Sequence, residues 1–232
     1  SVVDYGLLEF CIREDLNKIA PRGMAVLDPI KLVIDNYDDG LIEEFDAEVN
    51  PENPEMGSRK VAFSKELYIE RSDFMIEPVK GYFRLFPGNE VRLKYAYYVK
   101  VVSYETDDDG NVTVVHCTYD PASRGGWLPE RKVKGTIHWA GPKAFKAEVR
   151  LYDRLFNVED PAGVPDDEFV DAINPDSLIV LKDCLIEESI KDAKELESFQ
   201  FMRNGYFCVD KDSTPENPIF NRTVQLNSSW KK

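Results

Sequence analysis

The sequence predicts an all-β protein that carries one short helix at its N-terminus. Residues 4–18 show helical periodicity, and nearly everything after them reads as short strands separated by turns. In residues 80–102 apolar and polar side chains alternate with a period of two, and residues 87–89 (Pro-Gly-Asn) supply a turn between two such segments. Many short antiparallel strands with few helices are typical of β-barrels and β-sandwiches.

The helix is predicted over residues 4–18, with Asp4 as its N-cap and Pro21 beyond its end, because a proline disfavours helical backbone in the residue before it. Alternation and turn residues define the later elements. We expect strands at residues 27–37, 41–49, 60–63, 66–71, 80–85, 90–102, 112–117, 131–141, 145–156 and 178–187, a hairpin at 199–210 and a last strand at 218–227. A helical stretch is expected at 188–196, and the acidic residues 157–177 are long enough to connect two units.

Composition restricts what this chain can do. A length of 232 residues with 43% hydrophobic residues allows one large domain or two small ones with a real core. The net charge of −14 argues against a nonspecific binder of nucleic acids, because such binders need a broadly cationic surface. Any nucleic-acid site in this chain is therefore a local patch.

Cysteine usage and hydropathy predict a cytoplasmic location. The four cysteines are far apart in the sequence, with no C-x-x-C pair and no histidine at metal-ligand spacing, which fits a reducing compartment and predicts no metal site. No stretch approaches the roughly 18 consecutive apolar residues of a membrane span. No membrane partner is expected.

Cations gather in the alternating segment of residues 80–102. On one continuous strand, Arg92 and Lys94 would stand side by side about 7 Å apart, and Tyr82 would share a face with Arg84. Guanidinium groups and aromatic rings suit anionic, unstacked nucleotides. The same pattern fits the solvated outer face of an ordinary sheet, and the residues alone leave both interpretations open.

No autonomous catalytic centre is predicted. The two histidines, His116 and His138, lie inside strand patterns, and neither is next to a serine or cysteine nucleophile in the sequence. Neither of the glycine-rich phosphate-loop patterns occurs. The acidic run at residues 107–111 lacks the glycine and glutamate positions of an EF-hand loop, so we expect a solvated turn there.

Eight phrases spread along the chain are distinctive. They are REDLNKIAPRGMAVLDPIKLVIDNY (13–37), NPEMGSRKV (53–61), EVRLKYAYYVK (90–100), RKVKGTIHW (131–139), AEVRLYDRLF (147–156), INPDSL (173–178), FQFMRNGYFCVD (199–210) and FNRTVQL (220–226). In this order, and over essentially the whole chain, they resemble the C-terminal anticodon-binding region of glutaminyl-tRNA synthetases. The resemblance implies two β-barrels, with the end of a linking helical subdomain at residues 1–21, a proximal barrel at 22–71 plus 178–232, and a distal barrel at 72–177.

The resemblance also implies a function. The chain would bind the anticodon loop of glutamine tRNA for aminoacylation by an ATP-dependent glutamine–tRNA ligase, whose own catalytic domain, with its ATP and magnesium, is absent from this chain. We therefore expect no cofactor here, no DNA partner and no activation of glutamine by this chain alone. The alternatives are the same barrels from a glutamyl-tRNA synthetase of the archaeal or eukaryotic type, and a freestanding barrel protein that binds ribosomal RNA.

Residue roles carry over from the family position by position. Arg22 and Gln200 match the readers of the central anticodon uridine, Arg84 matches the reader of the third base, and Arg92 matches one of the arginines around the first base. The expected RNA-binding residues are Asn17, Arg22, Arg84, Arg92, Lys94, Gln200 and Arg203.

The chain departs from the family pattern at four of the positions near the anticodon. Lys94 stands where a second arginine is expected, so a bidentate fork becomes a point charge. Gly81 and Phe83 replace a glutamine and a lysine, and Glu52 replaces an asparagine. Reading of the first base would then be weaker or achieved differently, and Glu52 could repel phosphate.

Overall fold

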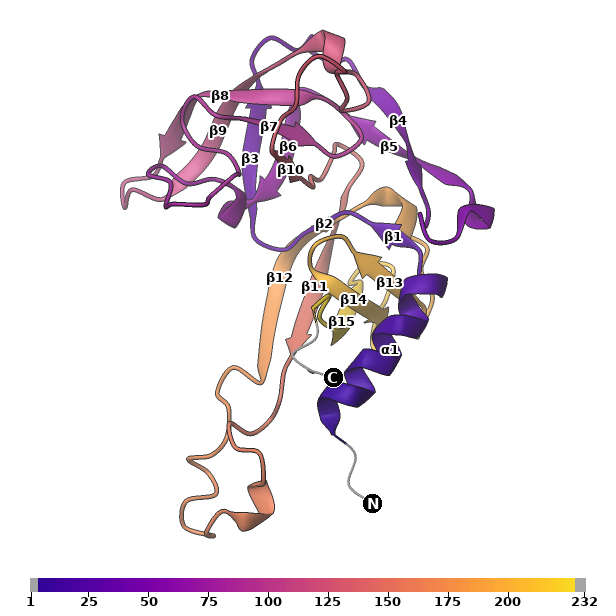
Figure 1. Ribbon diagram of the computed structural model, residues 1–232, viewed down its shortest axis with the longest axis vertical. Coiled ribbons are helices and arrows are strands. Elements are labelled where there is room, and N and C mark those ends of the chain that lie inside the picture. Colours follow the sequence, from indigo (N-terminus) through magenta and orange to yellow (C-terminus); the bar gives the residue numbers. More distant parts are fainter. Residues whose placement is uncertain (1–3, 228–232) are drawn as a thin grey trace.

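The computed structural model describes residues 4–227 and shows two β-barrel units with one α-helix at the N-terminal end (Figure 1). The expected all-β class, with two barrels and a short N-terminal helix, is confirmed. Residues 1–3 and 228–232, which the expected linking subdomain and proximal barrel include, lie outside the described part of the chain.

Helix α1 (Tyr5–Ile19) forms where the sequence predicts it. The Asp4 carboxylate accepts a hydrogen bond from a backbone N–H of the first turn at 3.1 Å, as an N-cap does. At the other end, the side-chain amide of the buried Asn50 donates to the carbonyl oxygens of Asn17 and Ala20, both at 3.1 Å. These carbonyls have no partner within the helix, so Asn50 fixes the end of α1 and the chain that follows it.

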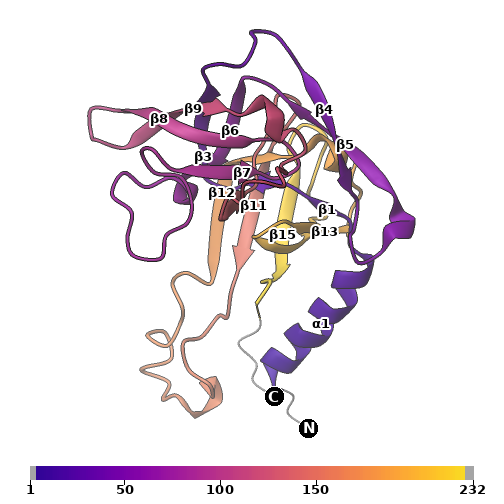
Figure 2. The ribbon, with the colours of Figure 1, turned by 45° about the horizontal axis from the view of Figure 1, so that its top comes forward.

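The first unit is a seven-stranded sheet in the order β1-β13-β14-β15-β11-β12-β2. Its strands are β1 (Arg22–Gly23), β2 (Ala25–Val26), β11 (Phe145–Tyr152), β12 (Leu178–Ile186), β13 (Ser198–Phe201), β14 (Gly205–Val209) and β15 (Ile219–Val224). Buried phenylalanines fill its centre, where the rings of Phe201 and Phe207 stack with centroids 4.4 Å apart. Helix α1 packs beside β13 and β15 through a cluster that includes Leu16 and Tyr206 (Figure 2).

The second unit is a six-stranded sheet in the order β10-β7-β8-β9-β3-β6, with the β4–β5 hairpin packed against it. Its strands are β3 (Pro29–Ile34), β4 (Glu43–Glu48), β5 (Ser58–Phe63), β6 (Glu66–Glu70), β7 (Glu90–Leu93), β8 (Tyr98–Thr106), β9 (Val112–Tyr119) and β10 (Gly135–Ile137). Phe63 on β5 packs edge-to-face on Tyr97 at 5.4 Å and on Trp139 at 5.2 Å between ring centroids. These aromatic contacts hold the hairpin on the sheet.

Strand pairing groups the chain differently from the expected barrel boundaries. β3 and β6, expected in the proximal barrel (22–71 plus 178–232), lie in the second sheet, and β11, expected in the distal barrel (72–177), pairs with β12 and β15 in the first. The pairs β1–β13, β3–β9, β7–β10 and β11–β15 are parallel, although antiparallel strands were expected. Parallel pairs join segments far apart in the sequence, which local alternation does not reveal. We propose barrels of residues 22–26 plus 145–224 and of residues 29–140.

The central segment of residues 80–102 does not form the two strands that its alternation predicts. Residues 80–85 form turns and one isolated bridge. The second half breaks into β7 and β8 at a turn in which Tyr95 has a left-handed backbone, with φ of 69°. Lys94 therefore lies in a turn at the end of β7, and it does not share one long strand with Arg92.

Two other predicted elements are much shorter in the structure. The strand expected at residues 131–141 is reduced to β10, and the helical stretch expected at 188–196 is reduced to one 3-10 turn. In the described chain, 3-10 helices occur at Pro54–Met56, Arg71–Asp73, Pro121–Ser123, Pro161–Gly163 and Glu188–Ile190.

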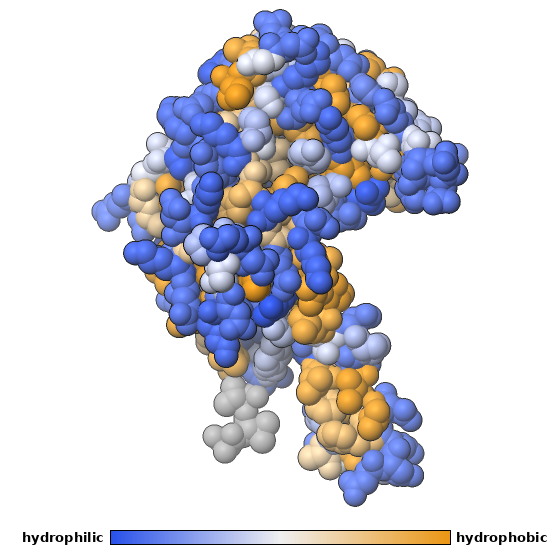
Figure 3. Space-filling model, turned by 180° about the vertical axis from the view of Figure 1, so that it is seen from behind, coloured by the Kyte–Doolittle hydropathy of each residue, from blue (hydrophilic) through white to orange (hydrophobic). Residues whose placement is uncertain are grey.

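Residues 153–177 form a projection between β11 and β12, at the bottom of Figure 1. A bridge between Phe156 and Ile173 and the rings of Phe156 and Phe169, 5.1 Å apart, organise it. Apolar side chains are prominent on it (Figure 3), and Val170 is 73% exposed. The acidic segment expected to connect two units is thus an excursion between neighbouring strands of one sheet.

The close approach of Gly141 to β5 can be tested by substitution. A Cβ at Gly141 would overlap the backbone carbonyl oxygen of Ala62, which cannot rotate away. Gly141→Ala is therefore expected to lower the free energy of unfolding by about 1–3 kcal/mol, as overpacking does. Gly163→Ala is the control, because its nearest neighbour would be the flexible carboxylate of Asp160 at 3.2 Å. Equal thermal unfolding temperatures of the two variants, measured by circular dichroism, would contradict this packing.

Candidate nucleic-acid interface

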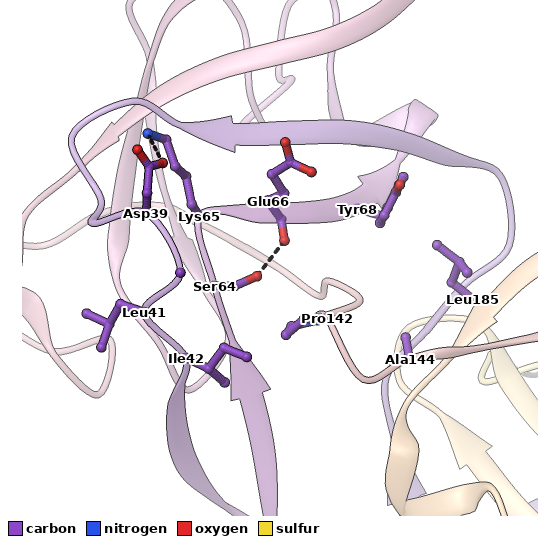
Figure 4. Close-up of a pocket in the computed structure, with 12 residues that line it drawn as sticks. Asp39, Leu41, Ile42, Ser64, Lys65, Glu66, Tyr68, Pro142, Ala144 and Leu185 are labelled. Carbon is purple, nitrogen blue, oxygen red and sulfur yellow. Dashed lines mark hydrogen bonds and ion pairs between the residues drawn. The ribbon is translucent and has the colours of Figure 1, made fainter.

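A cavity of about 460 Å³ beside the β4–β5 hairpin lacks the spare positive charge that a nucleic-acid site needs (Figure 4). Apolar groups such as Leu41 form part of its wall. Its charged side chains are paired, Lys65 with Asp39 at 2.8 Å and Glu66 with Lys31 at 2.8 Å. No cation of this cavity is left for a phosphate.

A second pocket, of about 300 Å³, lies where the two barrel units meet, and we call it the junction pocket. It is lined by Arg22, Gln200, Met202 and Arg203 from the first unit and by Arg92, Lys94, Thr136, Ile137 and His138 from the second. Five of the seven expected RNA-binding residues, namely Arg22, Arg92, Lys94, Gln200 and Arg203, therefore come together here from both units. Their contact with RNA stays a prediction.

A chain of hydrogen bonds orients Arg22 and Gln200 on one side of the junction pocket. The two residues are direct partners in the parallel pairing of β1 and β13. Gln200 donates from Nε2 to the Tyr206 hydroxyl at 2.8 Å, and this hydroxyl donates to Oδ1 of Asn17 at 3.2 Å. The same oxygen accepts from Nη2 of Arg22 at 2.9 Å. Asn17 thus lies behind the pocket and acts on it through Arg22.

Arg22, Arg92 and Lys94 have no carboxylate partner at ion-pair distance within residues 4–227. Nε of Arg22 is buried without a hydrogen-bond partner, so it is a donor that a ligand could satisfy. Arg92 donates from Nε to the hydroxyl of Thr136 at 3.0 Å and from Nη1 to the carbonyl oxygen of Gly126 at 3.3 Å. These neutral partners orient the guanidinium and leave its charge uncompensated.

Lys94 is half-buried beside two arginines of the junction pocket. Burial, together with the charges of Arg92 and Arg22, holds the pKa of Lys94 below its ordinary value, against the opposing charge of Glu48. The ammonium lies 4.9 Å from the ring centroid of Tyr95, which provides a weak cation–π contact. A lysine whose charged form is disfavoured in this way gains most from the arrival of an anion.

The two remaining cations among the expected residues share one carboxylate. Arg203 forms a bidentate pair with the fully buried Asp73, with Nη1 to Oδ2 at 2.6 Å and Nη2 to Oδ1 at 2.7 Å. Nε of Arg84 lies 3.2 Å from Oδ1 of Asp73. Arg84 does not line the junction pocket, and its guanidinium lies 6.0 Å from the ring centroid of Tyr82.

Sequence reasoning missed the residues that hold the expected ones in place. Asp73 gave no local signal, since Arg203 is 130 positions away from it. His138 read as an ordinary strand residue, but it is buried and its Nδ1 lies 3.2 Å from Nη1 of Arg203. The turn residues did not reveal Tyr206 either, because a two-residue turn at Asn204-Gly205 would place it opposite Arg203, whereas the structure pairs it with Gln200.

The lining of the junction pocket favours binding of acceptor groups. Guanidinium, ammonium and amide groups donate to phosphate oxygens and to the acceptor atoms of base edges.

Within residues 4–227, no group of three or more His, Cys, Asp or Glu side chains could hold a metal ion. None of the helices in the described part of the chain is long and apolar enough to cross a membrane.

Comparison with known proteins gives a consistent result along the chain. Residues 20–120 and residues 136–210 each match a family described as "tRNA synthetases class I (E and Q), anti-codon binding domain". Over its whole length the chain is 50% identical to a glutamine–tRNA ligase of Bradyrhizobium diazoefficiens and 51% identical to one of Cupriavidus metallidurans, and it is 49% identical to one of Vibrio parahaemolyticus. It spans 41%, 40% and 42% of the length of these relatives, about two fifths. The chain therefore belongs to the family of anticodon-binding domains of class I (E and Q) tRNA synthetases.

Proposed function

We propose that this chain recognises the bases of the glutamine tRNA anticodon in and beside the junction pocket. The observation that carries the proposal is the convergence of three cations without carboxylate partners, Arg22, Arg92 and Lys94, on one pocket of a chain with a net charge of −14. A chain of this charge repels RNA as a whole, so binding depends on a local set of desolvated donors. The description of its family supports an anticodon as the ligand.

Arg22 and Gln200 are the proposed readers of the central base. A planar guanidinium and an amide, held side by side on β1 and β13, offer donors and an acceptor to one base edge. Hydrogen bonds through Tyr206 and Asn17 orient both groups before RNA arrives, which reduces the entropy lost on binding. A wrong base would leave these groups unpaired, a penalty of about 1–3 kcal/mol per base.

Arg92 and Lys94 are proposed to serve the first base and its phosphate, and Arg84 the third base. Lys94 presents three donors around a point charge where the resemblance implies an arginine fork. We therefore expect Lys94 to contribute affinity through phosphate contact, and Arg92 to contribute more to the choice of base.

The activity of the whole protein is proposed from its relatives. They are glutamine–tRNA ligases, and this chain spans about two fifths of their length. We propose that the chain is the anticodon-recognition part of such a ligase in the cytoplasm, and that ATP and magnesium bind to a catalytic domain outside it. The free state of all four cysteines, at positions 11, 117, 184 and 208, supports a reducing compartment.

Base recognition can be measured with RNA hairpins. A hairpin whose loop carries the glutamine anticodon UUG is expected to bind roughly tenfold or more tightly than hairpins with one of these bases changed, because each mismatch leaves donors unpaired. Calorimetric titration at constant salt gives the dissociation constants, and a hairpin with a scrambled loop of equal length controls for charge. Equal affinity for all hairpins would contradict the proposal.

Arg22→Lys separates base reading from charge. The variant keeps the positive charge but loses the fork that meets Asn17 and the base edge. Selectivity for the central base is expected to fall by roughly tenfold, while the dependence of affinity on salt stays the same. An unchanged selectivity, with the affinity for every hairpin altered by the same factor, would mean that Arg22 contacts only phosphate.

Lys94→Met is expected to weaken binding without destabilising the fold. Loss of one phosphate contact should reduce the slope of log K against log salt by about one. Because the folded protein lowers the pKa of Lys94, the unfolded chain binds more protons between the two pKa values, and wild-type stability rises with pH across that interval. The variant should lack this rise and should be at least as stable at neutral pH.

The control for Lys94→Met is a lysine substitution outside the junction pocket. Lys100→Met removes an exposed lysine on β8 outside the junction pocket, and it should leave both the salt slope and the pH dependence nearly unchanged. Urea unfolding near pH 7 and pH 9.5 measures the stabilities. A clear loss of stability in Lys94→Met at neutral pH would disprove the electrostatic description of the pocket.

A further inference from the structure

One buried carboxylate holds two arginines that face different parts of the surface. Oδ2 of Asp73 accepts from Nη1 of Arg203 at 2.6 Å, and its Oδ1 lies 2.7 Å from Nη2 of Arg203 and 3.2 Å from Nε of Arg84. The two guanidinium groups therefore share one oxygen atom. A single negative charge cannot neutralise two positive ones, so each arginine competes with the other for Asp73.

The two arginines belong to different barrels. Arg203, in the turn between β13 and β14, lines the junction pocket, whereas Arg84 precedes β7 and lies outside it. Asp73 ends the 3-10 helix that follows β6. The Arg84 side chain is 43% exposed, and its guanidinium has two further contacts: Nη1 donates to the carbonyl oxygen of Ser72 at 3.2 Å, and the ring centroid of Tyr82 lies 6.0 Å away. A movement of Arg84 can thus move Asp73 and, with it, Arg203 in the wall of the junction pocket.

Arg203 is braced on its other side. Its Nη1 donates to Nδ1 of the buried His138 at 3.2 Å, and Nε2 of His138 donates to Oε1 of Glu70 at 3.2 Å. Glu70 in turn accepts from the backbone N–H groups of Leu27 at 2.9 Å and Asp28 at 3.0 Å. A guanidinium donates hydrogen bonds and cannot accept them, so Nδ1 of His138 must accept, and the ring hydrogen of the neutral histidine lies on Nε2. Arg84 is therefore the freer end of the network.

We propose that Asp73 is a positioning residue that couples recognition of the third anticodon base, beside Arg84, to recognition of the central base in the junction pocket. The inference rests on the proposed function, which supplies the bases. When the third base engages Arg84, the shared Oδ1 and with it Arg203 take the position that suits the central base. A wrong third base disturbs that position. Changing the central base as well then lowers the affinity by less than changing the central base alone.

The coupling can be measured on the unchanged protein, where folding is not in question. The UUG hairpin, hairpins with the central or the third base changed, and the hairpin with both changed form a double-mutant cycle in the RNA. The combined loss of affinity is expected to be smaller, by roughly threefold or more, than the product of the two single losses. A simple product would overturn the coupling, whereas no loss for any change would overturn the proposed function itself.

Protein variants then identify Asp73 as the link. Arg84→Met, at a partly exposed site, is expected to reduce selectivity for the third base and also, by roughly threefold, for the central base. Arg92→Met is the matched control, because Arg92 has no contact with Asp73 and should not affect selectivity for the third base. An Arg84→Met variant that loses selectivity for the third base alone would refute the link.

Asp73→Asn tests the carboxylate directly. It keeps the shape of the side chain but removes the charge that holds both arginines, so the two single losses should now multiply. Asp210→Asn, which removes another buried carboxylate that pairs with Arg150 outside the junction pocket, should leave the coupling intact. Persistence of the coupling in Asp73→Asn would disprove the role of Asp73. If circular dichroism shows that this variant does not fold, the comparison of Arg84→Met with Arg92→Met decides.

Discussion

The junction pocket depends on two arginine–carboxylate pairs with buried carboxylates that cross between the two barrels. Arg59 on β5 pairs with Glu187 at the end of β12, with side chains 8% and 4% exposed, and Glu187 also accepts from the backbone N–H of Met24 at 2.9 Å. Arg203, whose side chain is 32% exposed, and the fully buried Asp73 form the second pair between the barrels. Buried pairs lose hydration energy and are stable only when nearly all of their donors and acceptors are satisfied. They therefore allow very few relative positions of the barrels, and this fixes a pocket whose walls come from both.

The junction pocket places positive charge inside a protein of negative net charge. Such an arrangement favours binding of a fitting ligand in the pocket without a general affinity of the whole surface for RNA. A broad cationic surface would attract any RNA and release counterions from all of it. Here three cations that lack carboxylate partners gather in a pocket whose donors suit base edges, and the overall charge of −14 opposes contact elsewhere. Burial, together with the neighbouring arginines, lowers the pKa of Lys94, so assembling such a pocket before its ligand arrives disfavours the charged lysine. In the proposed function, fit to the bases, more than charge, determines which RNA binds.

Sequence patterns predicted those elements that are determined by residues close together in the chain. The N-cap at Asp4 and the stop at Pro21 gave the helix, and alternation gave most strands. Alternation failed at Tyr95, because nothing in the residue type announces a positive φ, and it therefore placed Lys94 on the wrong element. Alternation selected Arg92 and Lys94 as part of a cationic segment, whereas Arg22, Gln200 and Arg203 came from family resemblance, since no periodicity links β1, β7 and β13. Asp73 escaped both approaches, because its importance lies in a pairing over a long sequence distance.

Backbone strain is concentrated where the pocket needs side chains. Among the residues described, three that are not glycine have positive φ, and two of them, Tyr95 and Arg203, lie at the junction pocket, each with φ of 69°. Such a conformation costs about 1 kcal/mol or more at a non-glycine residue, and glycine would avoid this loss. Glycine at these positions would also remove the ring beneath Lys94 and the guanidinium that holds Asp73. The fold thus retains side chains in strained turns because those side chains build the pocket, and its stability is lowered at the place where its proposed function needs them.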